Sequence, residues 1–374
     1  MPLDTTDDKY ARAYYESAGP TLLAEMPPTL PGGDAQPDEN WNEIFQRREA
    51  RLNSLRNWRW SWWATWAVLA QYIRPERYHF VVAPNVWNKG NWLNEEIIDS
   101  TATLAMQICA AGMWTGLTSP TRPWFKLGVG LPGYEPDADA AEWLEDTEDL
   151  IYMILAESNF YNIMAQAFQD VATFGTAPVI IYEDQQDVIR CYLPCAGEYF
   201  LATGFRLNVD TLLREFVLTV YAIVEMFHLE NCPPDVQNMW AMGGASWDRE
   251  FVVAHSIEPN TSMLPRARSD KPFFVVPKKF AWCEVYWLRG QATEKPLSIR
   301  GFHEAPFFAA RWSVVSNNPY GRSPGWDALG DTKQIQLETV RKAEYVEKGV
   351  RPPMGGNPEL KNEPASIQPG HLTY

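Results

Sequence analysis

The sequence predicts an α+β protein with more than one packing unit. Apolar residues recur at helical spacing through much of the first half of the chain, whereas strand-like segments bounded by turns fill much of the second half. The 374 residues exceed the size at which a single hydrophobic core usually stops growing. Hydrophobic residues make up 46% of the chain and charged residues 21%, so the chain is expected to fold.

Residues 1–40 are expected to form an extended arm. Pro, Gly and acidic residues concentrate between positions 17 and 40 without apolar periodicity. The first residues, MPLDTTDDKY, are polar and acidic, so no secretory signal is expected. The longest apolar run, Ser61 to Ile73, covers about 13 residues and falls short of the ~20 needed to cross a bilayer. A soluble protein is therefore expected.

A long helix is predicted from Trp41 to Ile73. Pro75 should end it, because proline disfavours the helical conformation at the preceding Arg74. A stripe on one face is expected to be buried against a core or a neighbouring subunit, and a stacking platform for sugars or bases is the alternative. The residues of this stripe recur at helical spacing: Trp58, Trp62, Trp66, Leu69 and Ile73.

Three further helices and a set of strands complete the predicted body. Helices are expected at 94–117, whose small apolar middle indicates burial, at 137–158, with carboxylates in its first turns, and at 160–173. The segment 209–228 shows both helical and strand periodicity, so the pattern does not decide between a helix and a strand there. Strands are predicted at 124–131, 249–257, 272–277, 281–288 and 307–315, together with a hairpin around 184–187.

No residue pattern indicates a catalytic site, a cofactor or a metal. GVGLPG at 128–133 formally matches a phosphate-binding pattern, but the Pro132 inside it and the acidic residues after it oppose that interpretation. The histidines are scattered, and His303 beside Glu304 is expected to be a surface pair. A carboxylate cluster resembles a metal or acid/base site but is expected to be a solvated helix face: Glu142, Glu145, Asp146, Glu148 and Asp149.

Charge and cysteine content exclude two classes of protein. Lys and Arg number 32 against 47 Asp and Glu, and the net charge of −15 is the opposite of what a sequence-reading DNA-binding protein carries. Five cysteines without a C-x-x-C pair indicate reduced thiols in a cytoplasmic setting rather than a disulfide framework. Cys191 and Cys195 are expected to be buried and structural.

The stretch NNPYGRSPGWDALGD, from Asn317 to Asp331, predicts a stiff corner that leads into a long helix. The helix is expected from Asp327 to Gly349, about 34 Å long at ~1.5 Å per residue, and the residues from Arg351 to Pro353 should stop it. Two ion pairs are predicted along it, Glu338 with Lys342 and Glu344 with Lys348. A loose apolar strip is expected on one face: Leu329, Leu337, Val340, Ala343 and Val346.

Five segments in this order resemble the portal, or head-to-tail connector, proteins of short-tailed double-stranded DNA bacteriophages, over about residues 41–373. They begin with the Trp-rich helix and IRPERYHF and end with NPYGRSPGWDALGDTKQIQLETVRKAEYVEKGVRPPM. The resemblance implies a mixed α/β wing at 41–326, a stem helix at 327–350 and the start of a clip region at 351–374. The family's second stem helix and crown are expected to be missing from this chain.

The resemblance also implies the protein's role and its partners. Copies of this subunit would form a non-enzymatic ring of about twelve around a DNA channel. The ring would sit at one capsid vertex of the virion, after assembly in the host cytoplasm. It would contact the major capsid protein, the large subunit of the packaging terminase and tail adaptor proteins. An acidic ring suits a duplex that slides, because each fixed cation strengthens phosphate binding through counterion release.

Two groups of residues are the candidate sites of such a ring. The hinge between wing and stem would comprise Pro319, Gly321, Arg322, Pro324, Gly325 and Gly330. Proline at position 330 is expected to bend the helix at its start and to abolish assembly. The channel or the subunit interface would involve Lys333, Glu338, Arg341, Lys342 and Lys348. A carbohydrate-active hydrolase using Trp platforms and a carboxylate pair is the alternative from another class, and a different ring protein of tail or capsid is the third possibility.

Overall fold

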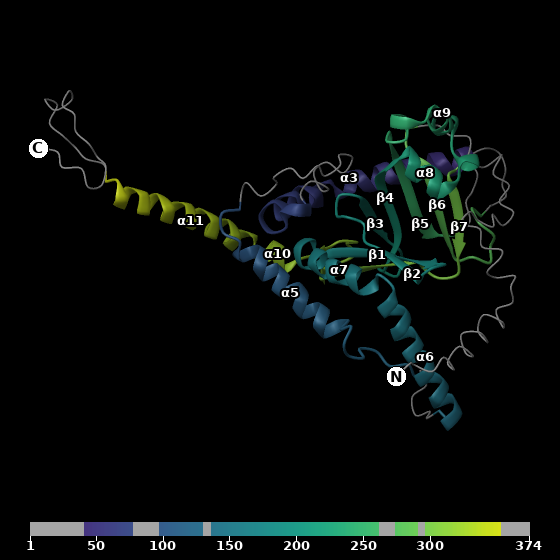
Figure 1. Cartoon of the computed structure of the whole chain (residues 1–374), viewed down its shortest axis with the longest axis horizontal. Helices are drawn as coiled ribbons and strands as arrows, with labels where there is room; N and C mark the ends of the chain where they lie inside the picture. The colour runs from purple at the N-terminus through teal and green to yellow at the C-terminus, as the bar shows by residue number, and fades with distance from the viewer. Residues whose placement is uncertain (1–40, 78–96, 130–135, 262–273, 291–295, 353–374) are drawn as a thin grey trace, which may run out of the picture.

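The computed structural model describes residues 41–77, 97–129, 136–261, 274–290 and 296–352, so the arm expected at 1–40 and most of the expected clip lie outside it. Figure 1 shows a body of helices and antiparallel strands from which one long helix, α11 (Leu329–Val350), projects. The α+β class predicted from the sequence is confirmed. Within the described residues, no helix combines the length and the apolar character needed to cross a membrane.

The first described element, α3 (Trp41–Ile73), is the long helix predicted from the sequence. Its first half packs Leu52 and Leu55 against the cluster that contains Trp287, and its second half buries Trp66 and Leu69 in a second cluster. The helix ends before Arg74, as expected from Pro75. Only the second half of the predicted stripe is buried, because Trp58 at the start of the stripe is 50% exposed.

The strands form two main antiparallel sheets. A five-stranded sheet has the order β3 (Tyr199–Thr203), β4 (Val209–Thr219), β5 (Glu250–Pro259), β6 (Trp282–Leu288) and β7 (Ser298–Phe302). A three-stranded sheet has the order β2 (Val188–Tyr192), β1 (Thr176–Asp184) and β8 (Phe307–Arg311), and it contains the predicted hairpin. Two short strands, β9 (Ser313–Val314) and β10 (Gly321–Arg322), pair beside it.

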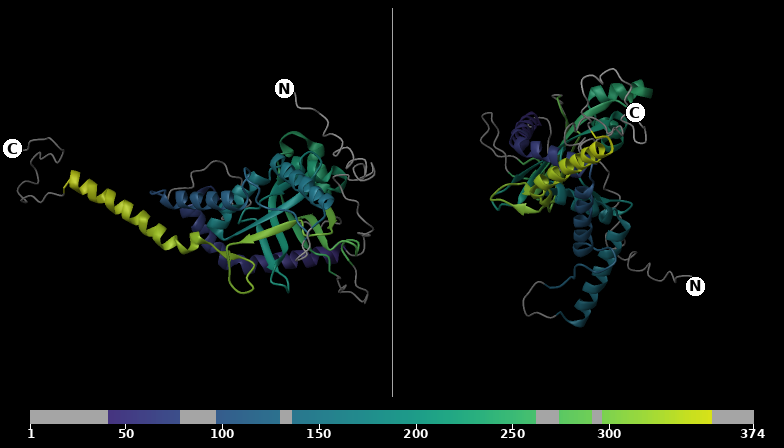
Figure 2. Two further views of the ribbon diagram at one scale, coloured as in Figure 1. Left: turned by 90° about the horizontal axis from the view of Figure 1, so that it is seen from below. Right: turned by 90° about the vertical axis from the view of Figure 1, so that its left-hand side faces the viewer.

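Helices cover these sheets and extend away from them (Figures 1 and 2). The ambiguous segment 209–228 divides into strand β4 and helix α8 (Val220–Phe227), and α9 (Pro234–Met242) follows. Two helices match their predictions closely, α6 (Ala138–Glu157), capped by Asp137, and α7 (Phe160–Phe174). The other two are α5 (Thr101–Leu117) and the single turn α10 (Pro324–Asp327).

The prediction that 94–117 is a buried helix is wrong for α5. The helix starts at Thr101, and only Met106 and Ala110 are buried in it. Leu104 is 53% exposed and Ile108 is 73% exposed. The helix contains no charged residue, so its composition indicated burial, but against the described residues it packs along one side only.

Three strand predictions need correction. The described part of 124–131 is not a strand, because the N–H groups of Trp124 and Phe125 donate to the Tyr152 hydroxyl at 2.8 and 2.9 Å, and Leu127 N donates to Glu148 Oε2 at 3.0 Å. These side chains of α6 satisfy the backbone in place of a neighbouring strand. The described part of 272–277 forms no strand, and 307–315 is broken at Trp312. Strands β3 and β7 were not predicted.

A buried polar network joins the two main sheets. Arg214 Nε donates to His255 Nδ1 at 2.8 Å, so the neutral imidazole carries its proton on Nε2 and donates it to Glu284 Oε1 at 2.7 Å. Tyr182 of the three-stranded sheet donates its hydroxyl to the same oxygen. Burial lowers the pKa of His255 to about 4, although the hydrogen bond to Glu284 opposes the shift.

This network predicts that acid weakens the fold through His255. The unfolded imidazole takes a proton near its ordinary pKa of 6.5, whereas the folded imidazole stays neutral down to about 4. The contribution of the neutral His255 to the free energy of unfolding is therefore fully present above pH 6.5. It is lost as the pH falls, by about 3 kcal/mol at pH 4. Urea unfolding from pH 7 to pH 4 should show a shallower decline for His255→Gln, which keeps a donor toward Glu284. An equally steep decline in that variant would contradict the assignment.

Candidate functional site: the corner at the base of α11

The predicted corner contains a serine, Ser323, that contacts two elements at once. Ser323 is fully buried, and its Oγ donates to the Thr173 carbonyl at 2.7 Å and accepts from Trp326 N at 2.9 Å. The second contact caps α10, in which Pro324 occupies the first turn. The middle of the corner is thereby attached to the last turn of α7.

Two backbones touch at the centre of the corner. Gly175 ends α7 in the left-handed region with φ +82°, and its carbonyl accepts from Trp312 N at 3.0 Å. A Cβ atom on Gly175 would lie 2.2 Å from the Gly321 carbonyl oxygen, and one on Gly321 would lie 2.5 Å from the Gly175 oxygen. Gly321 N also donates to Thr176 Oγ1 at 2.8 Å. Only glycine fits at either position without displacing the other chain segment.

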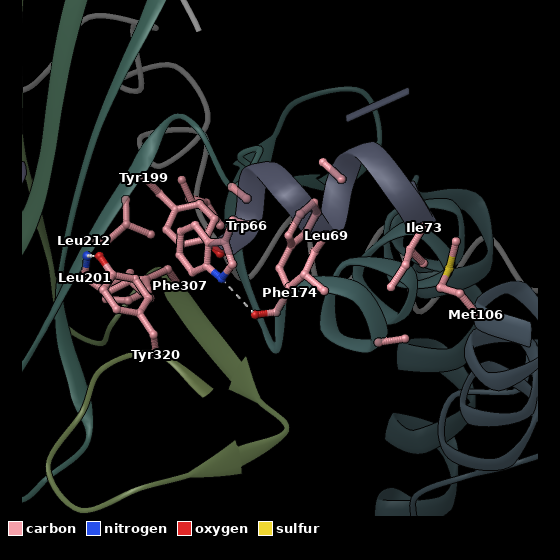
Figure 3. Close-up of a cluster of buried hydrophobic side chains, with 14 of the residues drawn as sticks. Trp66, Leu69, Ile73, Met106, Phe174, Tyr199, Leu201, Leu212, Phe307 and Tyr320 are labelled. Atoms are coloured by element: carbon pink, nitrogen blue, oxygen red, sulfur yellow. Dashed lines mark hydrogen bonds between the residues drawn. The ribbon is translucent and has the colours of Figure 1, made fainter. Parts of the chain in front are cut away.

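The neighbours of these two glycines in the sequence, Phe174 and Tyr320, belong to a buried aromatic cluster (Figure 3). Tyr320 is 1% exposed, and its ring meets Trp66 edge to face at a centroid distance of 5.1 Å. The Tyr320 hydroxyl accepts from Leu201 N at 3.0 Å, which connects the corner to β3. Trp66 donates its Nε1–H to the Phe174 carbonyl at 3.2 Å, and Trp62 packs edge to face on Trp326.

A buried ion pair attaches the end of α3 to α7. Arg74 Nη1 lies 2.5 Å from Asp170 Oδ1, and Arg77 Nη2 lies 3.4 Å from Asp170 Oδ2. Burial raises the pKa of Asp170, and the two arginines oppose that shift. The helix that carries Trp66 is therefore fixed to the helix that carries Gly175.

The remaining predicted hinge residues differ in their surroundings. Pro319 is buried, and a Cβ on Gly325 would lie 3.1 Å from the Ala172 carbonyl oxygen. Arg322 is exposed and pairs with Asp327 at 2.6 Å. Gly330 has no atom near its Cβ position and lies in the first turn of α11, where proline is tolerated. The structure therefore gives no reason to expect that Gly330→Pro bends the helix.

A glutamine that the sequence analysis missed holds the base of α11. Gln336 is 6% exposed, and its Oε1 accepts from Ile98 N at 2.7 Å and from Asp99 N at 2.8 Å. Its Nε2 donates to the Asp99 carbonyl at 2.6 Å. Nearby, the Lys333 ammonium lies 5.4 Å from the Tyr72 ring centre. The available signal was this glutamine, a polar residue in the middle of the face of α11 that contacts the body of the protein.

The long helix itself differs from its prediction in three respects. It is divided at Ala328 into α10 and α11, and its buried residues are the polar Thr332 and Gln336, whereas Leu337 and Val346 are more than half exposed. The pairs Glu338 with Lys342 and Glu344 with Lys348 do not form. Instead Gln334 donates to Glu338 at 2.7 Å and Arg341 pairs with Glu344 at 3.0 Å. Its end at Val350 agrees with the predicted stop.

The far half of α11 has no packing partner among the residues that the structure describes. Every residue from Arg341 to Val350 is exposed. The helix carries four cations, Lys333, Arg341, Lys342 and Lys348, and four carboxylates, Asp331, Glu338, Glu344 and Glu347, so its net charge is zero.

Among the described residues, no group of side chains near the corner is arranged for catalysis or metal binding. Among them, no three His, Cys, Asp or Glu side chains are grouped to hold a metal ion. Burial raises the pKa of Cys191 to about 11 and that of Cys195 to about 12, so these thiols are unreactive structural groups. GVGLPG at 128–133 lies mostly outside the described residues. The arrangement at the corner sets the direction of a helix.

Comparisons with known proteins identify a family for this chain. A family described as "Bacteriophage head to tail connecting protein" matches residues 46–374. The "Probable portal protein" of Bordetella phage BPP-1 is 34% identical over 325 residues, which cover 87% of this chain. The "Portal protein" of Salmonella phage epsilon15 is 34% identical over 330 residues, which cover 88% of this chain. The chain spans 57% of the length of each of these relatives.

The corner predicts a contrast between three glycine substitutions. Gly175→Ala adds a Cβ in a left-handed conformation against the Gly321 oxygen and should lower the free energy of unfolding by about 2 kcal/mol or more. Gly321→Ala should also destabilise the protein, through the clash alone. Gly330→Ala is the control, because its Cβ position is open and alanine favours helix by up to about 1 kcal/mol. Urea unfolding measures all three, and equal effects would contradict the close contact.

Proposed function

Because this chain belongs to the family of bacteriophage head-to-tail connecting proteins, we propose that it is a portal subunit whose copies form a ring around a DNA channel. The observation that carries the proposal is the position of α11. Contacts within the subunit fix its base, at Gln336 and at the corner, while the half from Arg341 to Val350 packs against no other described element. A helix with these properties is suited to pack against copies of itself.

A ring follows from a one-sided contact repeated by rotation. A heterologous contact closes into a ring only when the rotation between neighbours is fixed. The corner supplies that constraint, because the glycine contact and the cluster around Tyr320 set the tilt of α11 relative to the body. Tilt in turn sets the diameter of the ring. The exposed apolar side chains Tyr345, Val346 and Val350 would pack between neighbouring helices.

The charge distribution suits passage of a duplex rather than its retention. The whole chain has a net charge of −15 and α11 has none, so a channel lined by copies of α11 presents little net attraction to phosphates. Arg341 is paired with Glu344, and Lys333 lies over Tyr72, which limits their contact with DNA. Tight binding of DNA phosphates, which would slow the movement of the duplex during packaging and ejection, is thereby avoided.

The partners proposed for the ring are those of a head-to-tail connector. The wing would contact the major capsid protein at one vertex of the virion. The opposite end would receive the terminase large subunit during packaging in the host cytoplasm and tail adaptor proteins afterwards. The subunit itself would be non-enzymatic. The Trp platform of the alternative, a carbohydrate-active hydrolase, is reduced to Trp58, which is 50% exposed, because Trp66 lies in the core and Trp62 packs against it.

The proposal predicts a ring whose uniformity depends on Gln336. The wild-type chain should elute near twelve times its 42.7 kDa, with about twelve subunits around a central opening in electron micrographs. Gln336→Leu removes the acceptor for two backbone N–H groups and should loosen the tilt, which gives rings of several sizes. Gln334→Leu is the matched control, because that side chain is exposed and bonds only Glu338. A wild-type monomer under all solution conditions would contradict the proposed function.

A further inference from the structure

The outer face of α6 combines apolar and acidic side chains that have no partner among the described residues. Trp143 is 65% exposed, Leu150 is 46% exposed and Met153 is 51% exposed. Carboxylates stand between them at helical spacing, and they share the same face: Asp139, Glu142, Asp146 and Asp149. A solvated helix face, as predicted, accounts for the carboxylates but not for an exposed tryptophan among them.

The charge of this face restricts what can cover it. Two copies of α6 face to face would place carboxylates against carboxylates, which is unfavourable. The surface that covers α6 must therefore carry apolar groups together with a cation. The chain contains such a surface at the tip of the β3–β4 hairpin.

That hairpin tip exposes Phe205, Arg206 and Leu207. Phe205 is 92% exposed, Leu207 is 55% exposed, and the Arg206 guanidinium lies 5.4 Å from the Phe205 ring centre. Leu207 adopts φ +62°, a left-handed conformation that a bulky side chain rarely takes. Such strain persists only where the surroundings impose it, and it often marks a functional surface.

The structure around the tip imposes this conformation. Leu207 N donates to the Gly204 carbonyl at 3.0 Å, and Arg311 Nη2 donates to the Leu207 carbonyl at 3.3 Å. Thr203 Oγ1 donates to the Asn317 carbonyl at 3.2 Å, which ties the hairpin to the corner. Three hydrogen bonds thus hold the tip, and its apolar side chains are exposed in the single chain.

We infer that the hairpin tip of one copy docks on the outer face of α6 of the next copy. Phe205 and Leu207 would cover Trp143 and Leu150, and the Arg206 guanidinium would meet the neighbouring carboxylates. Figure 2 shows that α6 and the loop between β9 and β10, which lies beside the hairpin, leave the body on different sides. Two different surfaces of one chain would then form a heterologous contact, as a ring requires. This inference rests on the proposed ring.

Cross-linking between two variants that each carry one accessible cysteine tests the contact. One variant carries Arg206→Cys and the other Asp146→Cys, both with Cys109→Ala, because the other native cysteines are buried. A short bismaleimide added to the mixture should give a pair at twice the chain mass, several-fold above either variant alone. Val188→Cys, 46% exposed at the other hairpin, replaces Arg206→Cys in the control mixture. Thermal unfolding of each variant verifies that the fold is intact.

The outcomes separate this inference from the proposed function. Wild-type rings without a cross-link above the control would overturn the docking and leave the ring proposal standing. A cross-linked pair without rings would support the docking and contradict the ring. A charge exchange provides a second measurement: Arg206→Glu should weaken assembly, and Asp146→Arg in the same chain should restore part of it. Equal assembly by Arg206→Glu and wild type would also overturn the inference.

Discussion

The contact between the Gly175 and Gly321 backbones is the constraint on which the rest of the structure depends. Gly175 ends α7, and Gly321 belongs to the short strand β10 much later in the sequence. Their backbones lie so close together that neither position has room for a side chain. The three-stranded sheet, the ribbon of β9 and β10 and the start of α10 all meet there. Because the contact is between main chains, it leaves little freedom for the direction in which α11 departs.

The contacts around the two glycines extend this constraint to α3, β3 and the base of α11. The cluster of Trp66 and Tyr320 joins α3, β3 and the corner, and the buried pair of Arg74 with Asp170 joins α3 to α7. Gln336 adds a second point of attachment about two turns along α11. A helix held at two points keeps its tilt. A ring of identical subunits needs that property more than it needs any reactive group.

Charge is distributed over the chain in a way that fits assembly and passage. The acidic excess is prominent on α6, whereas α11 is balanced and α5 has no charged residue. An acidic face on one side of a subunit and an exposed arginine at the β3–β4 tip favour contact between unlike surfaces of neighbouring copies. In the proposed ring, a channel lined by the balanced helix α11 would have no strong attraction for a duplex.

The sequence by itself determined the elements whose signals are local. The apolar stripe of α3, the Asp137 cap of α6 and the Pro and Gly residues of the corner each act within a few residues of their position, so pattern and spacing revealed them. Only the tertiary structure decided which faces are covered. Gln336, the exposed side of α5 and the irregular backbone at 124–129 depend on partners far along the chain, such as Asp99 and Tyr152. Their roles depend on which segments meet in space, and no local pattern carries that information.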